Sequence, residues 1–504
     1  MSKKPNILMI CSDQHTARVT GCYGDQIVET PNLNALAAEG CRFDSFYCNN
    51  PICVPSRMSF MTGRYSFKCE SIGNQTMLDS RYPTLAHIAV RGGYHATLCG
   101  KMHFNGPDQR HGFLELLLGS NSSLGIYNGI DRPSKGPLGK YSLGNCSRPD
   151  PLFYVGAGEN QMAGYDDEVT ARTVKWMKKY AETPDAPPFF FVAGFMLPHC
   201  PYIGAPRLYR KYKDKVRAAK LTREQLDALH PHHKDYRKYI LLDEIPWKNL
   251  DKATAAYYAM TEQLDQNIGM IFNALRKNGL WENTIILYFA DHGEMLNYHG
   301  LWHKESFYED SARVPMIVRH PKIKLAKTSP VHHSLVDLMP TLCELVGVKP
   351  PPGIDGVSMI PALKGATPDL AAKSETYTFW ATHKPGLSSN RMVRKGPWKL
   401  CYYGAYDSYQ LFNLDEDPEE HNDLAKSPKH RTVIRKLSKL IFSDGWSANI
   451  AKEIQERLSA FGHPENMKAY RDVLHDGALK NDPLPIECPD YWEGSRKIFN
   501  TLEE

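Results

Sequence analysis

The chain has 504 residues, 42% of them hydrophobic and 23% charged, with a formal net charge of +5 at pH 7. This length suits one large domain and a smaller one, and so weak a charge argues against nucleic acid or an acidic membrane as the main partner. The twelve cysteines are scattered without CxxC pairs, which excludes a disulfide framework and a zinc ribbon.

The sequence contains no segment typical of export or of a membrane span. Residues 7–11 are apolar but too few for a signal peptide. The longest apolar run, residues 186–197, contains prolines and has about half the length that a membrane helix needs. We therefore expect a cytoplasmic protein, or one whose leader has been removed, with no membrane partner.

Strands and helices are predicted to alternate along most of the chain. Residues 7–11 and 189–195 are apolar throughout, as in strands buried on both faces of a parallel sheet. This alternation indicates an α/β fold with a large central, mostly parallel sheet flanked by helices. In chain order we expect a strand at 6–11, a helix at 30–40, a strand at 94–99, a helix at 166–180, a strand at 189–195, a helix at 252–278, strands at 284–290 and 314–318, and a helix at 335–346.

A smaller C-terminal α+β domain is predicted after this alternation ends. We assign residues 1–370 to the large α/β domain and residues 371–504 to the smaller one. Residues 105–164, rich in Gly, Ser and Pro, are predicted to form a long insertion over the ligand crevice, where substrate specificity is determined. The strand-like stretches of the smaller domain are 375–380, 398–403 and 410–413, followed by an acidic turn and two helical stretches.

Metal-type ligands follow two of the predicted strands. Asp13 and Gln14 come after the first strand, and Asp291 and His292 come directly after the clearest one, residues 284–290. A polar pair after one strand alone would be interpreted as a turn or a helix cap. Two such pairs point to a binding site, because proteins with parallel sheets bind their ligands beyond the carboxyl ends of the strands. Two carboxylates, an amide oxygen and an imidazole predict a site for Ca²⁺ or Mg²⁺, and the imidazole also permits Mn²⁺.

Cys53 is predicted to lie at the start of a short helix, because Pro55 suits the first turn of a helix. The helix N-terminus favours an anion there, and Arg57, one turn further, can bind a tetrahedral oxyanion. A structural cysteine is the ordinary alternative. A thiol phosphatase is another, but its loop requires an arginine six positions after the cysteine, where this chain has Ser59.

Two stretches resemble the signatures of one enzyme family. Residues 53–57 (CVPSR) and 62–64 (TGR) resemble the first sulfatase signature, C-x-P-S-R-x4-T-G-R. Residues 93–103 (GYHATLCGKMH) resemble the second, usually G-Y-x-T-x-x-x-G-K-W-H, with the threonine displaced by one position and Met102 in place of the tryptophan. The resemblance covers roughly residues 5–425 and is to the type I sulfatases of the alkaline phosphatase-like superfamily.

This resemblance implies a modified nucleophile and a metal. Cys53 would be oxidised by a formylglycine-generating enzyme, and the hydrate of the resulting formylglycine would be the nucleophile. The metal, usually Ca²⁺, would be held by Asp13, Gln14, Asp291, His292 and the modified Cys53. Carried over position by position, the catalytic residues are Cys53, Arg57, Lys101, His103, His199 and Lys304, and the residues that bind substrate are Lys101, His199 and Lys304. Asn74 is a further candidate for substrate binding, with an ordinary turn role as the alternative.

Two departures from the family pattern leave the metal and the substrate open. Many sulfatases have Asp-Asp where this chain has Asp13-Gln14, and Asp-Asn where it has Asp291-His292. The second variant resembles choline sulfatases, iduronate-type sulfatases and phosphonate monoester hydrolases. The preference for sulfur or phosphorus is therefore not decided by these residues.

The function that these residues predict is hydrolysis of a sulfate monoester, either a sugar sulfate or a small alkyl sulfate. Lys101, Lys304 and Arg57 can neutralise the negative oxygens of the ester, and His199 is the favoured proton donor to the leaving alcohol. One alternative is a phosphonate monoester or phosphodiester hydrolase with the same nucleophile. Another is an inactive binding protein in which Cys53 is never converted. The oligomeric state cannot be read from the sequence.

Overall fold

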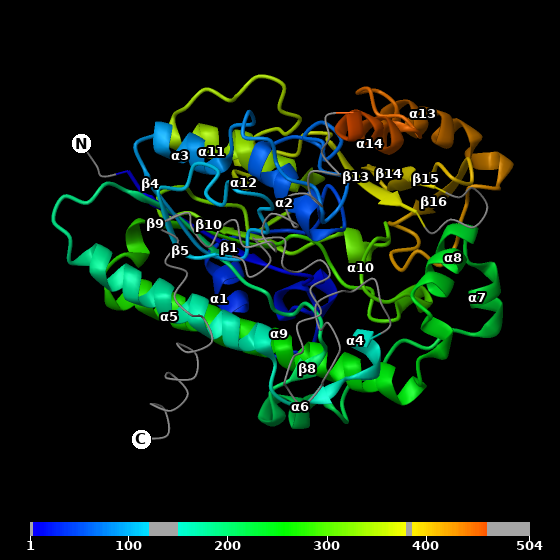
Figure 1. The fold of residues 1–504 in the computed structure, drawn as a ribbon, viewed down its shortest axis with the longest axis horizontal. Helices are drawn as coiled ribbons and strands as arrows, with labels where there is room; N and C mark the ends of the chain where they lie inside the picture. Colours follow the sequence, from blue (N-terminus) through cyan, green and yellow to red (C-terminus); the bar gives the residue numbers. More distant parts are fainter. Residues whose placement is uncertain (1–3, 120–149, 380–385, 461–504) are drawn as a thin grey trace. The chain divides into compact units, whose positions relative to one another are not determined.

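The computed structural model describes residues 4–119, 150–379 and 386–460. Its main feature is an eight-stranded sheet with the order β11-β2-β10-β9-β1-β7-β4-β5 (Figure 1). The strands from β9 to β5 are parallel, β10 is antiparallel to both of its neighbours, and β11 is parallel to β2. The predicted large, mostly parallel sheet is confirmed. Its strands are β1 (Asn6–Ser12), β2 (Cys41–Phe43), β4 (His95–Gly100), β5 (Glu115–Leu118), β7 (Phe189–Gly194), β9 (Thr284–Ala290), β10 (Met316–Arg319) and β11 (Thr328–Ser329).

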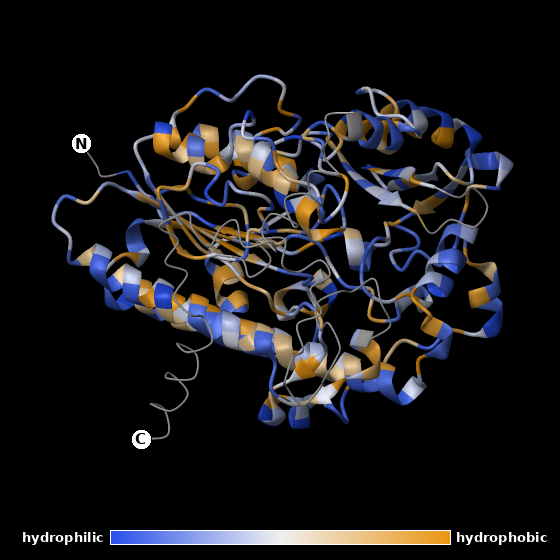
Figure 2. Cartoon of the chain, viewed as in Figure 1, coloured by the Kyte–Doolittle hydropathy of each residue, from blue (hydrophilic) through white to orange (hydrophobic). Residues whose placement is uncertain are grey.

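Helices cover both faces of this sheet. Every residue of β1, β7 and β9 is buried, and Figure 2 shows these central strands in the hydrophobic colours. The apolar runs seen in the sequence therefore reflect strands with a core on each side. One face is covered by α2 (Cys53–Thr62), α3 (Leu85–Arg91) and α11 (Leu338–Val346), and the other by α1 (Pro31–Glu39), α5 (Gln161–Ala181) and α9 (Trp247–Lys277) (Figure 1).

A second, antiparallel sheet follows in the chain. Its four strands pair in sequence order, β13-β14-β15-β16, and α13 (Arg431–Ile441) packs against it. Residues 1–452 form one compact unit, and the domain boundary at residue 370 stays a prediction. The strands are β13 (Ala371–Thr378), β14 (Ser388–Lys395), β15 (Trp398–Tyr403) and β16 (Ser408–Asn413).

The remaining elements are short, and most lie in the connections. Of the insertion predicted at residues 105–164, residues 120–149 lie outside the described part of the chain, and the described remainder includes β5, α4 and β6. No helix within the described ranges is long and apolar enough to cross a membrane. The short elements are β3 (Phe46–Tyr47), α4 (Asp150–Phe153), β6 (Gly156–Ala157), β8 (Ile203–Gly204), α6 (Pro206–Tyr212), α7 (Arg223–Ala228), α8 (Pro231–Tyr239), α10 (Glu309–Ala312), β12 (His333–Ser334), α12 (Ile360–Leu363) and α14 (Ile450–Ala460).

The sequence pattern missed several strands, among them β2, β5 and β14, and it shortened two helices. β14 reads SSNRMVRK and is almost entirely buried between β13 and β15, but its polar composition hides it from an apolar pattern. Helix α9 begins five residues before the predicted start at residue 252, and α5 begins five before residue 166. These first turns carry mixed residues, so the apolar stripe alone places the start too late.

A buried ion pair joins β14 to the chain after α13. Arg391 is fully buried and donates to both carboxylate oxygens of Asp444, at 2.5 and 2.8 Å. Lys373 Nζ lies 2.8 Å from the same carboxylate. Burial alone would raise the pKa of Asp444, but its hydrogen bonds with Arg391 and the charges of Arg391 and Lys373 lower it from 3.8 to about 2.

We expect Asp444→Asn to lower the free energy of unfolding by about 2 kcal/mol at pH 7, since the folded chain favours the ionised carboxylate by nearly two pKa units. The carboxylate has the lower pKa in the folded state. Its stabilisation is therefore present above about pH 4 and is lost as the pH falls toward 2. Urea denaturation of both proteins at pH 7, 4 and 3 should show a difference that shrinks at the lowest pH.

The matched control is Asp227→Asn. Asp227 pairs with Arg223 at 3.1 Å on an exposed helix surface, where such a pair contributes about 0.5 kcal/mol or less. Equal losses in the two variants, or a loss in Asp444→Asn that persists undiminished at pH 3, would contradict the role given to the buried pair.

Candidate active site

Two strand ends meet at the carboxyl edge of the central sheet. β1 and β9 are parallel, and their register ends with Ser12 opposite Ala290. Asp13 and Asp291 therefore emerge from the sheet side by side, and both are fully buried. The backbone N–H of Gln14 donates to Asp291 Oδ1 at 3.1 Å, which joins the two strand ends.

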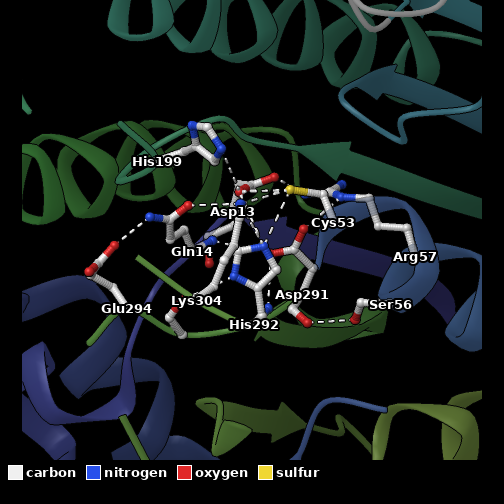
Figure 3. Close-up of polar contacts among 12 residues, drawn as sticks. Asp13, Gln14, Cys53, Ser56, Arg57, His199, Asp291, His292, Glu294 and Lys304 are labelled. Carbon is white, nitrogen blue, oxygen red and sulfur yellow. Dashed lines mark hydrogen bonds and ion pairs between the residues drawn. The ribbon is translucent and has the colours of Figure 1, made fainter. Parts of the chain in front are cut away.

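Helix α2 brings Cys53 to the same edge. The helix begins at Cys53, and all of its residues are buried. Ser56 Oγ donates to the backbone oxygen of Asp291 at 2.5 Å, which holds the first turn against the strand end. The predicted ligands converge here: one ligand atom from each of Asp13, Cys53, Asp291 and His292 lies within 4.8 Å of the others, an arrangement that could hold a metal ion (Figure 3).

The Arg57 side chain joins the two carboxylates. Its Nε donates to Asp291 Oδ2 at 2.8 Å, and its Nη2 donates to Asp13 Oδ2 at 3.0 Å. The remaining Nη1 donates to the backbone oxygen of Lys101 at 2.7 Å. Removing one partner from so deeply buried an ion pair leaves an uncompensated charge. Arg57 thus holds the carboxylates in place, and these contacts had not been predicted.

Two lysines lie on the other sides of the cluster. Lys101 Nζ is 2.7 Å from Asp13 Oδ2. Lys304 Nζ is 3.1 Å from Cys53 Sγ and 3.2 Å from His292 Nε2. Both lysines are almost completely buried, so their charges act in a medium that screens them little.

His103 and His199 also lie close to the nucleophile position, since Cys53 raises the pKa of each imidazole against the effect of burial. His199 Nε2 lies 3.9 Å from Asp13 Oδ1, and its Nδ1 lies 2.6 Å from the backbone oxygen of Cys200. Burial and the charge of Lys304 lower the pKa of His199. The imidazole is therefore neutral at pH 7, with Nδ1 as the donor and Nε2 as an acceptor turned to the site.

The electrostatics favour an ionised Cys53. Burial and the Asp13 carboxylate raise the pKa of this thiol, but Lys304, Lys101 and His292 lower it to well below its ordinary value. In contrast, burial raises the pKa of the Cys11 and Cys48 thiols, which lie close by in the core. Cys53 differs from these packing residues through its positive neighbours.

Gln14, the remaining one of the five predicted metal ligands, turns its amide oxygen toward the cluster. Gln14 Oε1 accepts a hydrogen bond of 2.9 Å from Lys304 Nζ. On its other side, Gln14 Nε2 donates to Glu294 Oε2 (Figure 3). It also donates to Tyr202 Oη at 3.2 Å. Neither Glu294 nor Tyr202 was predicted as part of the site. The available signal was that Glu294 follows the Asp291-His292 pair on the same loop.

Asn74 lies at the start of α2. Its Oδ1 accepts a hydrogen bond of 3.0 Å from the backbone N–H of Val54. Asn74 therefore satisfies one of the unpaired N–H groups of the first helical turn. Its role in substrate binding stays a prediction.

The donor set fits a hard divalent cation. Burial and the neighbouring Asp13 carboxylate together raise the pKa of Asp291 to about 6, against the opposing charge of Arg57. Two carboxylates held this close in a buried site favour an added positive charge. Two carboxylates, an amide oxygen and an imidazole are ligands that Ca²⁺ and Mg²⁺ accept. Asp13, Gln14, Asp291 and His292 would hold such an ion beside residue 53.

Comparison with known proteins places this site in a family. Residues 5–348 match the family model described as Sulfatase, and residues 297–444 match that of the C-terminal region of N-sulphoglucosamine sulphohydrolase. A choline-sulfatase of Rhizobium meliloti is 33% identical over 99% of this chain and 98% of its own length. An N-acetylglucosamine-6-O-sulfatase of Bacteroides thetaiotaomicron is 26% identical, with 87% of this chain and 86% of that protein covered.

The fold has solved counterparts. The structure of a phosphonate monoester hydrolase from Silicibacter pomeroyi matches with a TM-score of 0.72 and 24% identity, over 87% of this chain and 95% of that one. This likeness concerns the fold alone. The family model covers most of the chain and includes the convergent cluster around Cys53. The chain therefore belongs to the sulfatase family, and it is a sulfuric ester hydrolase that acts on a sulfate monoester.

Proposed function

We propose that the chain hydrolyses its sulfate monoester with a formylglycine made from Cys53, next to a divalent cation held by Asp13, Gln14, Asp291 and His292. One observation supports this above the others: residues from two strand ends and one helix bring their ligand atoms within 4.8 Å of one another. We place Ca²⁺ first among the candidate ions, because oxygen donors predominate in the set.

Formylglycine supplies an aldehyde hydrate, whose one hydroxyl is a nucleophile and whose other hydroxyl allows sulfate to be expelled without attack by a further water. The structure contains an unmodified cysteine at position 53. The sulfur of Cys53 marks the position from which the hydrate would attack. The conversion requires a separate formylglycine-generating enzyme, which we propose as the maturation partner. The bound cation would supply positive charge next to the reacting oxygens.

Three positively charged side chains orient the carboxylates and bind the sulfate group. Arg57 keeps Asp13 and Asp291 ionised and oriented. Lys304, at 3.1 Å from Cys53 Sγ, is close enough to the nucleophile to pair with an oxygen of the incoming sulfate. Lys101 is placed to do the same from the side of Asp13. The negative charge of the ester is thus met by fixed positive charges that need no rearrangement.

His199 is the proposed proton carrier for the leaving alcohol. Its neutral imidazole presents Nε2 as an acceptor. It must first take up a proton before it can donate one to the leaving oxygen. The proton given up by the nucleophile is a source, because residue 53 lies close enough to His199 to raise the pKa of its imidazole.

The substrate is proposed to be a small alkyl sulfate or a sugar sulfate. The choline-sulfatase relative matches nearly the whole chain, and the other relative is named for a sugar sulfate. Choline sulfate and N-acetylglucosamine 6-sulfate are therefore the first two compounds to assay. Parallel assays distinguish the two substrate classes directly.

The nucleophile is tested by mass spectrometry of the peptide that contains Cys53. Coexpression with a formylglycine-generating enzyme should yield the aldehyde at this position, and sulfatase activity should rise with the converted fraction. Cys53→Ala should lower kcat on the order of 10⁴-fold or more, because the group that attacks the ester is lost. Cys22→Ala, at a half-buried cysteine outside the site, is the control and should keep its activity. Active protein with only unmodified cysteine at position 53 would refute the proposal.

The choice of sulfur over phosphorus is tested by turnover of three matched esters. We expect the converted enzyme to hydrolyse an aryl sulfate with a higher kcat/KM than the corresponding aryl phosphonate or aryl phosphodiester. All three leave the same phenolate, so the ratio reports how the site treats the central atom and its charge. A sulfate that is slowest by a wide margin would instead favour a phosphonate monoester or phosphodiester hydrolase with this nucleophile.

A further inference from the structure

Glu294 lies behind the proposed metal ligands and does not belong to the cluster of ligand atoms. It is fully buried and sits two residues after His292 (Figure 3). Its carboxylate accepts four hydrogen bonds. Oε1 accepts from the backbone N–H groups of Leu296, at 3.1 Å, and His303, at 2.7 Å. Oε2 accepts from Gln14 Nε2 and from Tyr202 Oη, the latter at 2.6 Å.

Two backbone donors hold the carboxylate in one position. The Glu294 backbone N–H also donates to the oxygen of Asp310 at 2.9 Å. The side chain is therefore anchored at both ends by groups whose own positions are set by the main chain. A carboxylate held in this way presents Oε2 to Gln14 as a fixed acceptor.

A fixed acceptor decides which way the Gln14 amide points. The two ends of a glutamine amide have nearly the same shape, but one is an NH₂ donor and the other an oxygen acceptor. Both oxygens of the Glu294 carboxylate act as acceptors, so the NH₂ group of Gln14 faces Glu294. The amide oxygen then faces the cluster, where it accepts from Lys304 Nζ at 2.9 Å.

Tyr202 reinforces the same orientation. Its hydroxyl donates to Glu294 Oε2, and its oxygen accepts from Gln14 Nε2 at 3.2 Å. The ring of His303 stacks on Tyr202, and its Nδ1 lies 2.9 Å from the same hydroxyl. Reversal of the amide would set its oxygen against two acceptor oxygens and lose both bonds to the NH₂ group.

We propose that Glu294 is a positioning residue for the divalent cation: by accepting from Gln14 Nε2, it keeps the amide oxygen of Gln14 turned toward the ion. This role rests on the proposed function, because it concerns the cation held by Asp13, Gln14, Asp291 and His292. It explains a buried carboxylate whose hydrogen bonds come from Gln14, Tyr202 and two backbone N–H groups.

The variant that tests this role is Glu294→Gln. It keeps the size of the side chain but replaces one acceptor oxygen with an NH₂ group, so the Gln14 amide no longer has a single preferred orientation. Loss of a group that orients a metal ligand typically weakens metal binding 10- to 100-fold. We expect that loss in the dissociation constant for Ca²⁺, measured by calorimetry on the full-length converted protein after removal of divalent ions with a chelator.

The matched control is Glu262→Gln on α9. Glu262 is also a buried carboxylate that accepts from a tyrosine hydroxyl, of Tyr212, and from a glutamine amide, of Gln266 at 3.2 Å. It has no contact with the cluster, so its variant should bind Ca²⁺ as the wild type does. Thermal unfolding with and without Ca²⁺ supplies a second readout. A merely structural loss lowers both melting temperatures equally, whereas loss of positioning reduces the rise that Ca²⁺ produces.

A double-mutant cycle then tests whether Glu294 acts through Gln14. Gln14→Leu removes the amide, and adding Glu294→Gln to it should weaken Ca²⁺ binding no further, because the group to be oriented is gone. Additive losses, or a Glu294→Gln variant with the wild-type dissociation constant, would overturn the positioning role alone. Absence of Ca²⁺ binding in the wild-type protein would overturn the calcium site of the proposed function and this role with it.

Discussion

The Arg57 guanidinium bridge between Asp13 and Asp291 is the constraint on which the site depends. Two fully buried carboxylates at neighbouring strand ends would repel each other, and the fork of Arg57 bonds one oxygen of each. The bridge requires β1 and β9 to be adjacent, parallel and in the observed register. A slip of one residue would turn one of the carboxylates toward the other face of the sheet. The active site therefore forms only when β1 and β9 pair in the observed register.

The same bridge explains the spacing of the motif around Cys53. Residues four apart on a helix lie on one face, so when Arg57 reaches the carboxylates, Cys53 at the start of α2 is brought to the same place. Ser56 fixes the rotation of the helix through its bond to the backbone of Asp291. The C-terminal end is set by Gly63, whose φ of 68° is the left-handed conformation typical of a helix end.

Much of the fold and the convergence of the site could be predicted from the sequence. Strands buried on both faces leave long apolar runs, and parallel strands place their following residues at one edge, so Asp13 and Asp291 could be paired in advance. Other features leave no local signal. β14 is buried but polar, because its side chains are paired with charges from distant segments, as Arg391 is with Asp444. Similarly, the cap that Asn74 forms on α2 depends on a contact 20 residues away.

The hydrogen bond to Glu294 accounts for a glutamine, rather than an aspartate, at position 14 of the proposed metal pair. An aspartate at position 14 would bring a carboxylate toward Glu294, and two anions in a buried site raise each other's free energy. A glutamine offers the same kind of oxygen to a cation while its NH₂ group gives Glu294 a donor. The residue at position 14 is thus tied to the carboxylate behind it through a hydrogen bond. For the proposed ion, the choice of an uncharged ligand at position 14 follows from the neighbouring Glu294 as much as from the ion itself.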